Sequence, residues 1–193
     1  MMGKTHQAAA VATVFLVAPR ISEVVMPSFQ VPSILVLVGT AMFGALLPDC
    51  DTPKSKLGRK MFILLLPYYL LQWLVKLLSH IYTPLKKVSK GIGHRGVVHD
   101  PCLWLTFSLP FFLYYIVKEE RSWLFVLIGL MIGILSHLFL DYLSGGIPVY
   151  LFKKERLKAP IYIETGSVGE MIIFFMLVVI DIVLIKGYLK GGV

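Results

Sequence analysis

Long apolar runs separated by short polar segments dominate the chain, and this alternation predicts transmembrane helices. The apolar runs lie at residues 5–18, 32–47, 101–117, 123–143 and 168–185. A crossing helix needs about 20 apolar residues, with about 17 as the lower limit, so the run at 5–18 can cross only with little tilt. The pattern predicts an all-α, polytopic membrane protein with about five spans.

A sixth apolar stretch, at 59–80, differs from the other five. Its centre reads MFILLLPYYLLQWLVKLL and contains Pro67, Gln72 and Lys76. A proline and polar groups inside a short apolar helix are typical of an interfacial or re-entrant helix. Because no linker or internal repeat divides the sequence, we expect residues 1–193 to form a single membrane-embedded domain.

The composition favours the same class of protein. The chain is 57% hydrophobic and 16% charged, with a mean hydropathy of +0.79, whereas soluble domains are about 45–50% apolar and about 25% charged. The net charge of +8 fits cytoplasmic loops and contact with the lipid bilayer. Since no soluble basic patch with interleaved aromatic residues occurs, nucleic acid is not an expected partner. His6 and Gln7 interrupt the first apolar run, so we interpret it as a retained helix and not a signal peptide.

Ionisable side chains gather at the ends of the apolar runs. They are His6 at the first run, Asp49 and Asp51 after the second, His94, Arg95, His99 and Asp100 before the third, His137 and Asp141 at the end of the fourth, and Glu164 and Glu170 before the fifth. If 59–80 stays on one side of the membrane, all these ends lie on the same face. That face then holds 14 of the 19 lysines and arginines, which predicts a cytoplasmic N-terminus and cluster, and a C-terminus outside.

The spacing of these residues suits metal coordination. His137 and Asp141 are four residues apart on a predicted helix, so their side chains share one face and can bind one ion. Mixed histidine and aspartate ligands suit Zn²⁺, with Mn²⁺, Fe²⁺ and Mg²⁺ as alternatives. The cluster has enough donors for one or two ions. Two ions about 3.5–4 Å apart would activate water for an in-line displacement at phosphorus, and Arg95 could hold a phosphate oxygen.

Four motifs follow one another in an order that resembles a known family. They are His6, LPDCDTPKS at 47–55, GHRGVVHD at 93–100 and SHLFLDYLSGG at 136–146, followed by Gly166 and Glu170. In this order, over roughly residues 1–170, the sequence resembles the YdjM-like membrane-bound proteins, which are classed by inference as metal-dependent hydrolases. Three positions depart from the family pattern: Thr52 stands where the family has histidine, and Val98 and Asp100 stand where it has threonine and serine.

The resemblance and the spacing together give a set of candidate site residues. The expected metal ligands are His6, Asp49, Asp51, His94, His99, His137 and Asp141, and the expected catalytic residues are Arg95, Asp100 and Glu170. Asp100 is also a candidate replacement for the ligand missing at Thr52. These residues predict a hydrolase in the inner (cytoplasmic) membrane of a prokaryote, acting on a phosphate ester or a lipid-like substrate.

A non-enzymatic membrane protein is the alternative hypothesis. The same cluster could hold a structural metal in a scaffold, or could belong to a metal or ion transporter. A transporter would need ionisable residues across the bilayer midplane, and the spans contain almost none apart from Asp181. Bis-histidine haem binding is disfavoured because carboxylates accompany the histidines. A homo-oligomer is compatible with either hypothesis.

Overall fold

The computed structural model describes residues 2–25, 31–92, 96–119, 121–149 and 156–190. Its helices are α1 (Gly3–Val25), α2 (Val31–Gly44), α3 (Lys56–Lys60), α4 (Phe62–Leu78), α5 (Leu85–Ile92), α6 (Pro101–Val117), α7 (Arg121–Ser144) and α8 (Val168–Leu189), with 3₁₀ turns η1 (Pro48–Asp51) and η2 (Val97–His99). Within these ranges no β-strand forms, and only Ile147 and Leu157 pair as an isolated bridge. The predicted all-α class is therefore confirmed.

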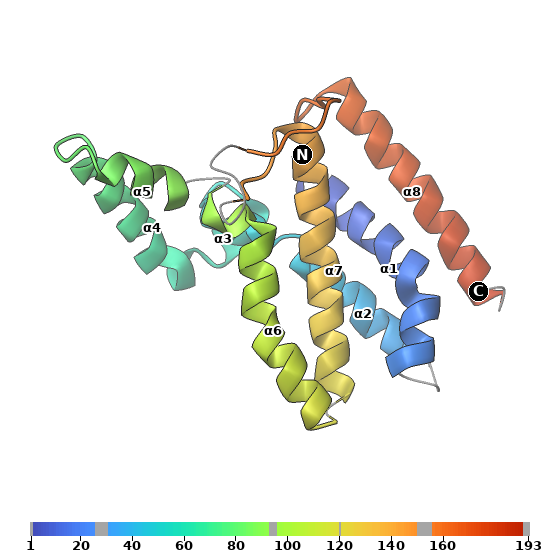
Figure 1. Cartoon of the computed structure of the whole chain (residues 1–193). Coiled ribbons are helices and arrows are strands. Elements are labelled where there is room, and N and C mark those ends of the chain that lie inside the picture. Colours follow the sequence, from blue (N-terminus) through green and yellow to red (C-terminus); the bar gives the residue numbers. More distant parts are fainter. Residues whose placement is uncertain (1, 26–30, 93–95, 120, 150–155, 191–193) are drawn as a thin grey trace.

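The helix α7 is the centre of the bundle (Figure 1). It packs against α1, α2 and α6, while α8 packs on α1. Val14, Leu37 and Phe125 come from α1, α2 and α7 and meet in one buried apolar cluster. These packed helices fix the positions of the polar residues at their ends.

Small residues let α2 and α7 approach closely. A Cβ atom built on Gly133 would lie 2.0 Å from the carbonyl oxygen of Ala41, and one on Gly129 would lie 2.0 Å from Thr40 Oγ1. Gly129 and Gly133 form a G-x-x-x-G stripe on α7, a pattern that allows close backbone contact between membrane helices. His137 continues this stripe one turn further, so close packing brings it against the end of α2.

Three segments are long and apolar enough to cross a membrane by length and composition, among the residues described: Ser33–Asp51, Ser122–Ser144 and Val168–Leu189. The apolar helices α4 and α6 are shorter. The expected run at 5–18 is only part of α1, which has 23 residues and continues through Pro19 and Arg20. Helical packing against its neighbours thus extends α1 beyond its apolar sequence. The count of five spans and the single-domain assignment remain predictions.

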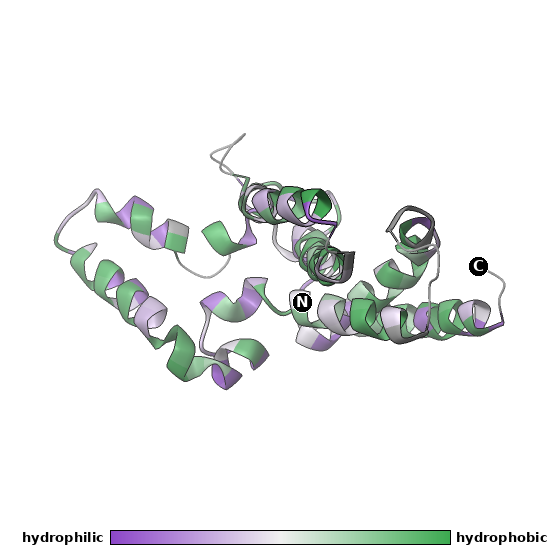
Figure 2. Cartoon of the chain, turned by 90° about the horizontal axis from the view of Figure 1, so that it is seen from below, coloured by the Kyte–Doolittle hydropathy of each residue, from purple (hydrophilic) through white to green (hydrophobic). Residues whose placement is uncertain are grey.

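The helices α4 and α5 form a hairpin that stands beside the bundle (Figure 1). Seen from below, α4 is largely hydrophobic, and α5 alternates hydrophobic and hydrophilic residues (Figure 2). Residues 59–80 were expected to form one interfacial or re-entrant element. They comprise the end of α3 and all of α4, which Met61 separates. Their place at the membrane interface remains a prediction.

Candidate metal centre

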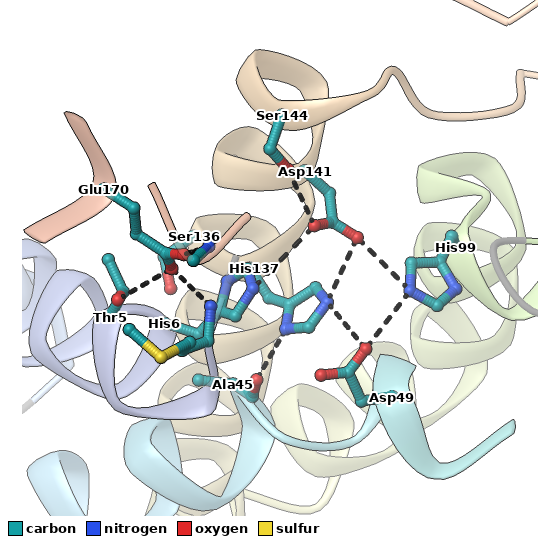
Figure 3. Close-up of polar contacts among 12 residues, drawn as sticks. Thr5, His6, Ala45, Asp49, His99, Ser136, His137, Asp141, Ser144 and Glu170 are labelled. Carbon is teal, nitrogen blue, oxygen red and sulfur yellow. Dashed lines mark hydrogen bonds and ion pairs between the residues drawn. The ribbon is translucent and has the colours of Figure 1, made fainter. Parts of the chain in front are cut away.

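Three helical residues and two residues from 3₁₀ turns meet at one end of the bundle (Figure 3). The donor atoms form two groups of three, His6, His137 and Asp141, and Asp49, His99 and His137. Within each group the donor atoms lie within 4.8 Å of one another. His6, His99, His137 and Asp141 are buried, whereas the side chain of Asp49 is 21% exposed. Solvent therefore reaches this cluster at Asp49.

Short contacts join two histidine nitrogens to two aspartate oxygens in the cluster. His99 Nε2 lies 3.3 Å from Asp141 Oδ2 and 3.7 Å from Asp49 Oδ1. His137 Nε2 lies 3.5 Å and 3.7 Å from the same two oxygens. Ligands at zinc's usual bond length, about 2.0–2.1 Å, stand about 3.4 Å apart in a tetrahedron. Four of the six distances among these donors are therefore close to the tetrahedral value for zinc.

A backbone contact decides which nitrogen His137 can offer. Its Nδ1 lies 2.7 Å from the carbonyl oxygen of Ala45, which can only accept, so Nδ1 carries the proton and Nε2 keeps its lone pair. Both donor groups use His137, and one lone pair binds one ion. The two groups therefore cannot hold two ions that both use this histidine.

His6 lies on the other side of Asp141. Its ring stacks on that of His137 with centroids 3.7 Å apart, and its Nε2 is 3.8 Å from Asp141 Oδ1. Neither ring nitrogen of His6 has a hydrogen-bond partner in the described part of the chain, although the residue is only 1% exposed. Burial of an unsatisfied imidazole costs free energy, and a cation near Asp141 would offset that cost.

Asp51 holds the opposite edge of His99. Its Oδ2 lies 3.5 Å from His99 Nδ1, while His99 Nε2 faces the other donors. A carboxylate on the far nitrogen of a histidine orients the ring toward a metal. Asp51 thus lies behind the candidate ligand His99, and its own expected role as a ligand remains a prediction.

Three carboxylates surround the ring of His99. Burial by itself lowers the pKa of His99, but contacts with Asp141, Asp49 and Asp51 outweigh burial and raise the pKa from 6.5 to about 10. The carboxylates thus favour a positive charge at this point. A divalent cation among the donors would balance the negative charge of these carboxylates, as the proton on His99 does in its absence.

Glu170 lies outside the donor groups. Its Oε1 accepts hydrogen bonds from the backbone N–H of Met2 and from Thr5 Oγ1, and its Oε2 accepts one from the backbone N–H of Gly166. Oε1 thus anchors the start of α1, which carries His6, to the start of α8, while Oε2 is bound by the turn just before α8. These contacts favour a positioning role for Glu170, and its expected catalytic role remains a prediction.

Asp100 also stands apart from the donor groups. Its Oδ1 accepts a hydrogen bond of 2.9 Å from the backbone N–H of Cys102 and caps the N-terminus of α6. Helix capping therefore explains an aspartate at position 100 independently of the change at Thr52. Two further candidates, His94 and Arg95, lie outside the described residues.

Sequence reasoning missed a set of side chains on α4 that hold the motif loops. Gln72 Nε2 donates to the carbonyl oxygens of Asp51 and Ile92, at 3.0 Å and 2.6 Å. The hydroxyl of Tyr69 donates to the carbonyl oxygen of Cys50 at 2.9 Å. These contacts tie the turn with Asp49 and Asp51 to the segment that leads into His99. The signal in the sequence that could have predicted these contacts is the presence of a glutamine and two tyrosines inside an apolar helix.

The fold and the site together define an all-α membrane protein with a buried cluster of histidines and aspartates that could hold a metal ion. Residues 1–189 match the family described as YdjM inner membrane protein, and the chain belongs to this family. It is a multi-pass protein of the bacterial inner membrane. No solved structure matches the chain.

Two curated relatives are similar over most of the chain. The uncharacterized protein YvsG of Bacillus subtilis (strain 168) is 29% identical over 140 residues, which cover 72% of this chain and 71% of YvsG. The inner membrane protein YdjM of Escherichia coli (strain K12) is 30% identical over 148 residues, which cover 74% of this chain and 63% of YdjM. The chain thus spans less than two thirds of the length of YdjM.

Proposed function

We propose that this protein is a membrane-bound, metal-dependent hydrolase that holds one divalent ion between Asp49, His99, His137 and Asp141. The observation that carries the proposal is the set of four donor distances of 3.3–3.7 Å. Zinc suits this donor set best, because imidazoles and carboxylates are among its usual ligands.

Such an ion supplies Lewis-acid activation of water and of the substrate's oxygen. The residues of the chain divide the remaining tasks. Asp51 orients His99, the carbonyl oxygen of Ala45 fixes the tautomer of His137, and Asp49 occupies the side open to solvent. We infer that water and substrate approach past Asp49, whose carboxylate can accept a proton there.

The position of the cluster suggests the class of substrate. The donors lie where polar 3₁₀ turns meet long apolar helices, so a substrate with a polar group and an apolar part could contact both regions. We propose a phosphate ester or a lipid phosphate as the substrate. Arg95, four residues before His99, would stabilise the negative charge that develops on the phosphate.

Metal content and hydrolysis test this proposal together. We expect the purified protein to contain about one zinc ion per chain, His137→Ala to lose it, and His80→Ala to retain it. His80 is a suitable control because it is exposed and its Nδ1 contacts only the carbonyl oxygen of Lys76 among the contacts described. Equal metal in the protein and in His137→Ala would refute the site.

A second candidate function is a structural metal site in a non-enzymatic membrane protein. Four protein donors fill a tetrahedron, and closed tetrahedral sites are typical of structural zinc. Asp49→Asn separates the two functions. For a hydrolase we expect this variant to bind zinc more weakly and, even when saturated with zinc, to lose hydrolysis of a chromogenic phosphate ester. If neither protein hydrolyses any phosphate ester or phospholipid while metal removal unfolds both, the structural function is the correct one.

A further inference from the structure

The outer surface of α4 carries an exposed apolar band. Ile63, Leu64, Leu70, Leu71, Trp73 and Leu77 are all between 49% and 87% exposed. At about 100° per residue these positions cover about half of the helix circumference. A helix that packs on a single neighbour needs an apolar stripe of only about 100°, so the band is wider than one partner helix would cover.

The opposite side of α4 is fixed by hydrogen bonds to the rest of the protein. Tyr68 and Gln72 donate to the carbonyl oxygen of Ile92, and Tyr69 donates to that of Cys50. These bonds set the rotation of α4 about its axis. The apolar band must therefore face away from the metal centre and from the contacts with α5.

The neighbouring helix α5 presents positive charge. Lys86, Lys87 and Lys90 are exposed, and at about 100° per residue they share one side of α5. The surrounding sequence strengthens this charge, because residues 52–99 contain nine lysines and arginines and no aspartate or glutamate. Exposed Trp73 and Tyr82 lie in the same hairpin, and these residue types favour the level of the lipid headgroups.

We propose that the α4–α5 hairpin, residues 62–92, is a binding site for anionic phospholipids at the membrane surface. Acyl chains contact the apolar band of α4, and the headgroup phosphates contact Lys86, Lys87 and Lys90. Charge complementarity selects this occupant, because the segment is uniformly basic and a second copy would bring an equally basic hairpin against it. The inference does not depend on hydrolase activity.

Fluorescence quenching by brominated lipids tests the proposal. The full chain is placed in nanodiscs of phosphatidylcholine with a minor fraction of phosphatidylglycerol, with bromine on the acyl chains of one lipid at a time. The difference between the protein and Trp73→Phe isolates the signal of Trp73. We expect both lipids to quench Trp73, with an association constant for phosphatidylglycerol roughly fivefold higher, which is the contribution of about one lysine near an anionic surface.

Two triple variants with the same change in charge identify the lysines responsible. We expect Lys86→Gln, Lys87→Gln and Lys90→Gln together to abolish the preference for phosphatidylglycerol and to leave quenching by phosphatidylcholine unchanged. The control replaces Lys118, Lys186 and Lys190, exposed residues at the C-terminal ends of α6 and α8, with glutamine and should keep the preference. Equal quenching by the two lipids, loss of preference in the control, or no quenching of Trp73 would overturn the proposal.

Discussion

At the scale of single residues, contacts to the far ring nitrogen of each histidine decide which nitrogen faces the other donors. His137 directs Nε2 inward because Nδ1 is held by the carbonyl oxygen of Ala45. His99 has carboxylates at both nitrogens, with Asp51 on one side and Asp49 and Asp141 on the other. The carbonyl oxygen of Ala45 and the carboxylate of Asp51 thus orient candidate ligands although neither would itself contact the ion.

Replacement of Asp51 tests this arrangement. We expect Asp51→Asn to weaken zinc affinity by about 10–100-fold, as typical for partners that orient a ligand histidine, while the protein still binds one ion. Competition with a chromogenic chelator measures the change. The matched control is Asp100→Asn, which keeps a good helix cap and should leave the affinity unchanged. A large loss of affinity in the control would identify Asp100 as the ligand that replaces the one missing at Thr52.

The pH dependence of stability gives a second test at this scale. Because the pKa of His99 is raised from 6.5 to about 10, its protonated form stabilises the metal-free protein fully below pH 6.5, and this contribution is lost as the pH rises through about 10. Metal requires the neutral imidazole, so metal affinity increases over the same range. We expect Tm in a chelator to fall as pH rises, and the increase in Tm from added zinc to grow. A zinc effect that is independent of pH would contradict this prediction.

At the scale of elements, the distance between α2 and α7 controls the cluster. Gly133 lies against the backbone of Ala41, and His137, one turn later on α7, reaches the carbonyl oxygen of Ala45. The chain leaves α2 at Gly44 and leads into the turn that carries Asp49. A change in helix separation therefore alters the distances between donors from both helices.

A single methyl group tests this dependence. In Gly133→Ala the new Cβ would lie 2.0 Å from the carbonyl oxygen of Ala41, so the helices must separate. Overpacking of this kind costs about 1–3 kcal/mol, and we expect a lower Tm and less bound zinc. Gly39→Ala is the control, because a Cβ there meets no atom within 4 Å. Equal metal content in the two variants would show that helix separation does not set the site.

At the scale of the whole molecule, the starts of α1 and α8 and the end of α7 lie at the same end of the bundle (Figure 1). Glu170 joins the first two through Thr5 and the backbone of Met2. Asp181 is different: it lies eleven residues further along α8, about 16 Å from Glu170 at 1.5 Å per residue. Its Oδ1 has no hydrogen-bond partner in the described ranges, and it takes no part in the cluster.

The expected membrane orientation rests on the distribution of charge, since the five-span arrangement assigns 14 of the 19 basic residues to the face of the cluster. We expect a reporter fused after Val193 to be active outside the cytoplasm and a reporter inserted after Lys87 to be active inside it. Paired alkaline phosphatase and fluorescent protein fusions measure both positions. A cytoplasmic signal after Val193 would rule out five spans.

The sequence by itself determined the class of the fold and the residue types of the candidate site. Apolar runs predicted the helical membrane protein because bilayer thickness and backbone hydrogen bonding leave few other solutions. The predicted bounds of α6, 101–117, agree with the helix, since Asp100 and Pro101 are strong start signals. Histidines and aspartates at the ends of the runs identified the cluster because such groups are costly elsewhere in a membrane.

Only the tertiary structure decided which of those residues face one another. Sequence spacing could pair His137 with Asp141, which share one helix face, but it could not place Asp51 behind His99. It also could not show that Glu170 anchors α1. These roles depend on contacts between residues far apart in the chain, which arise only when close packing of α2 and α7 and the hydrogen bonds from α4 bring the loops together.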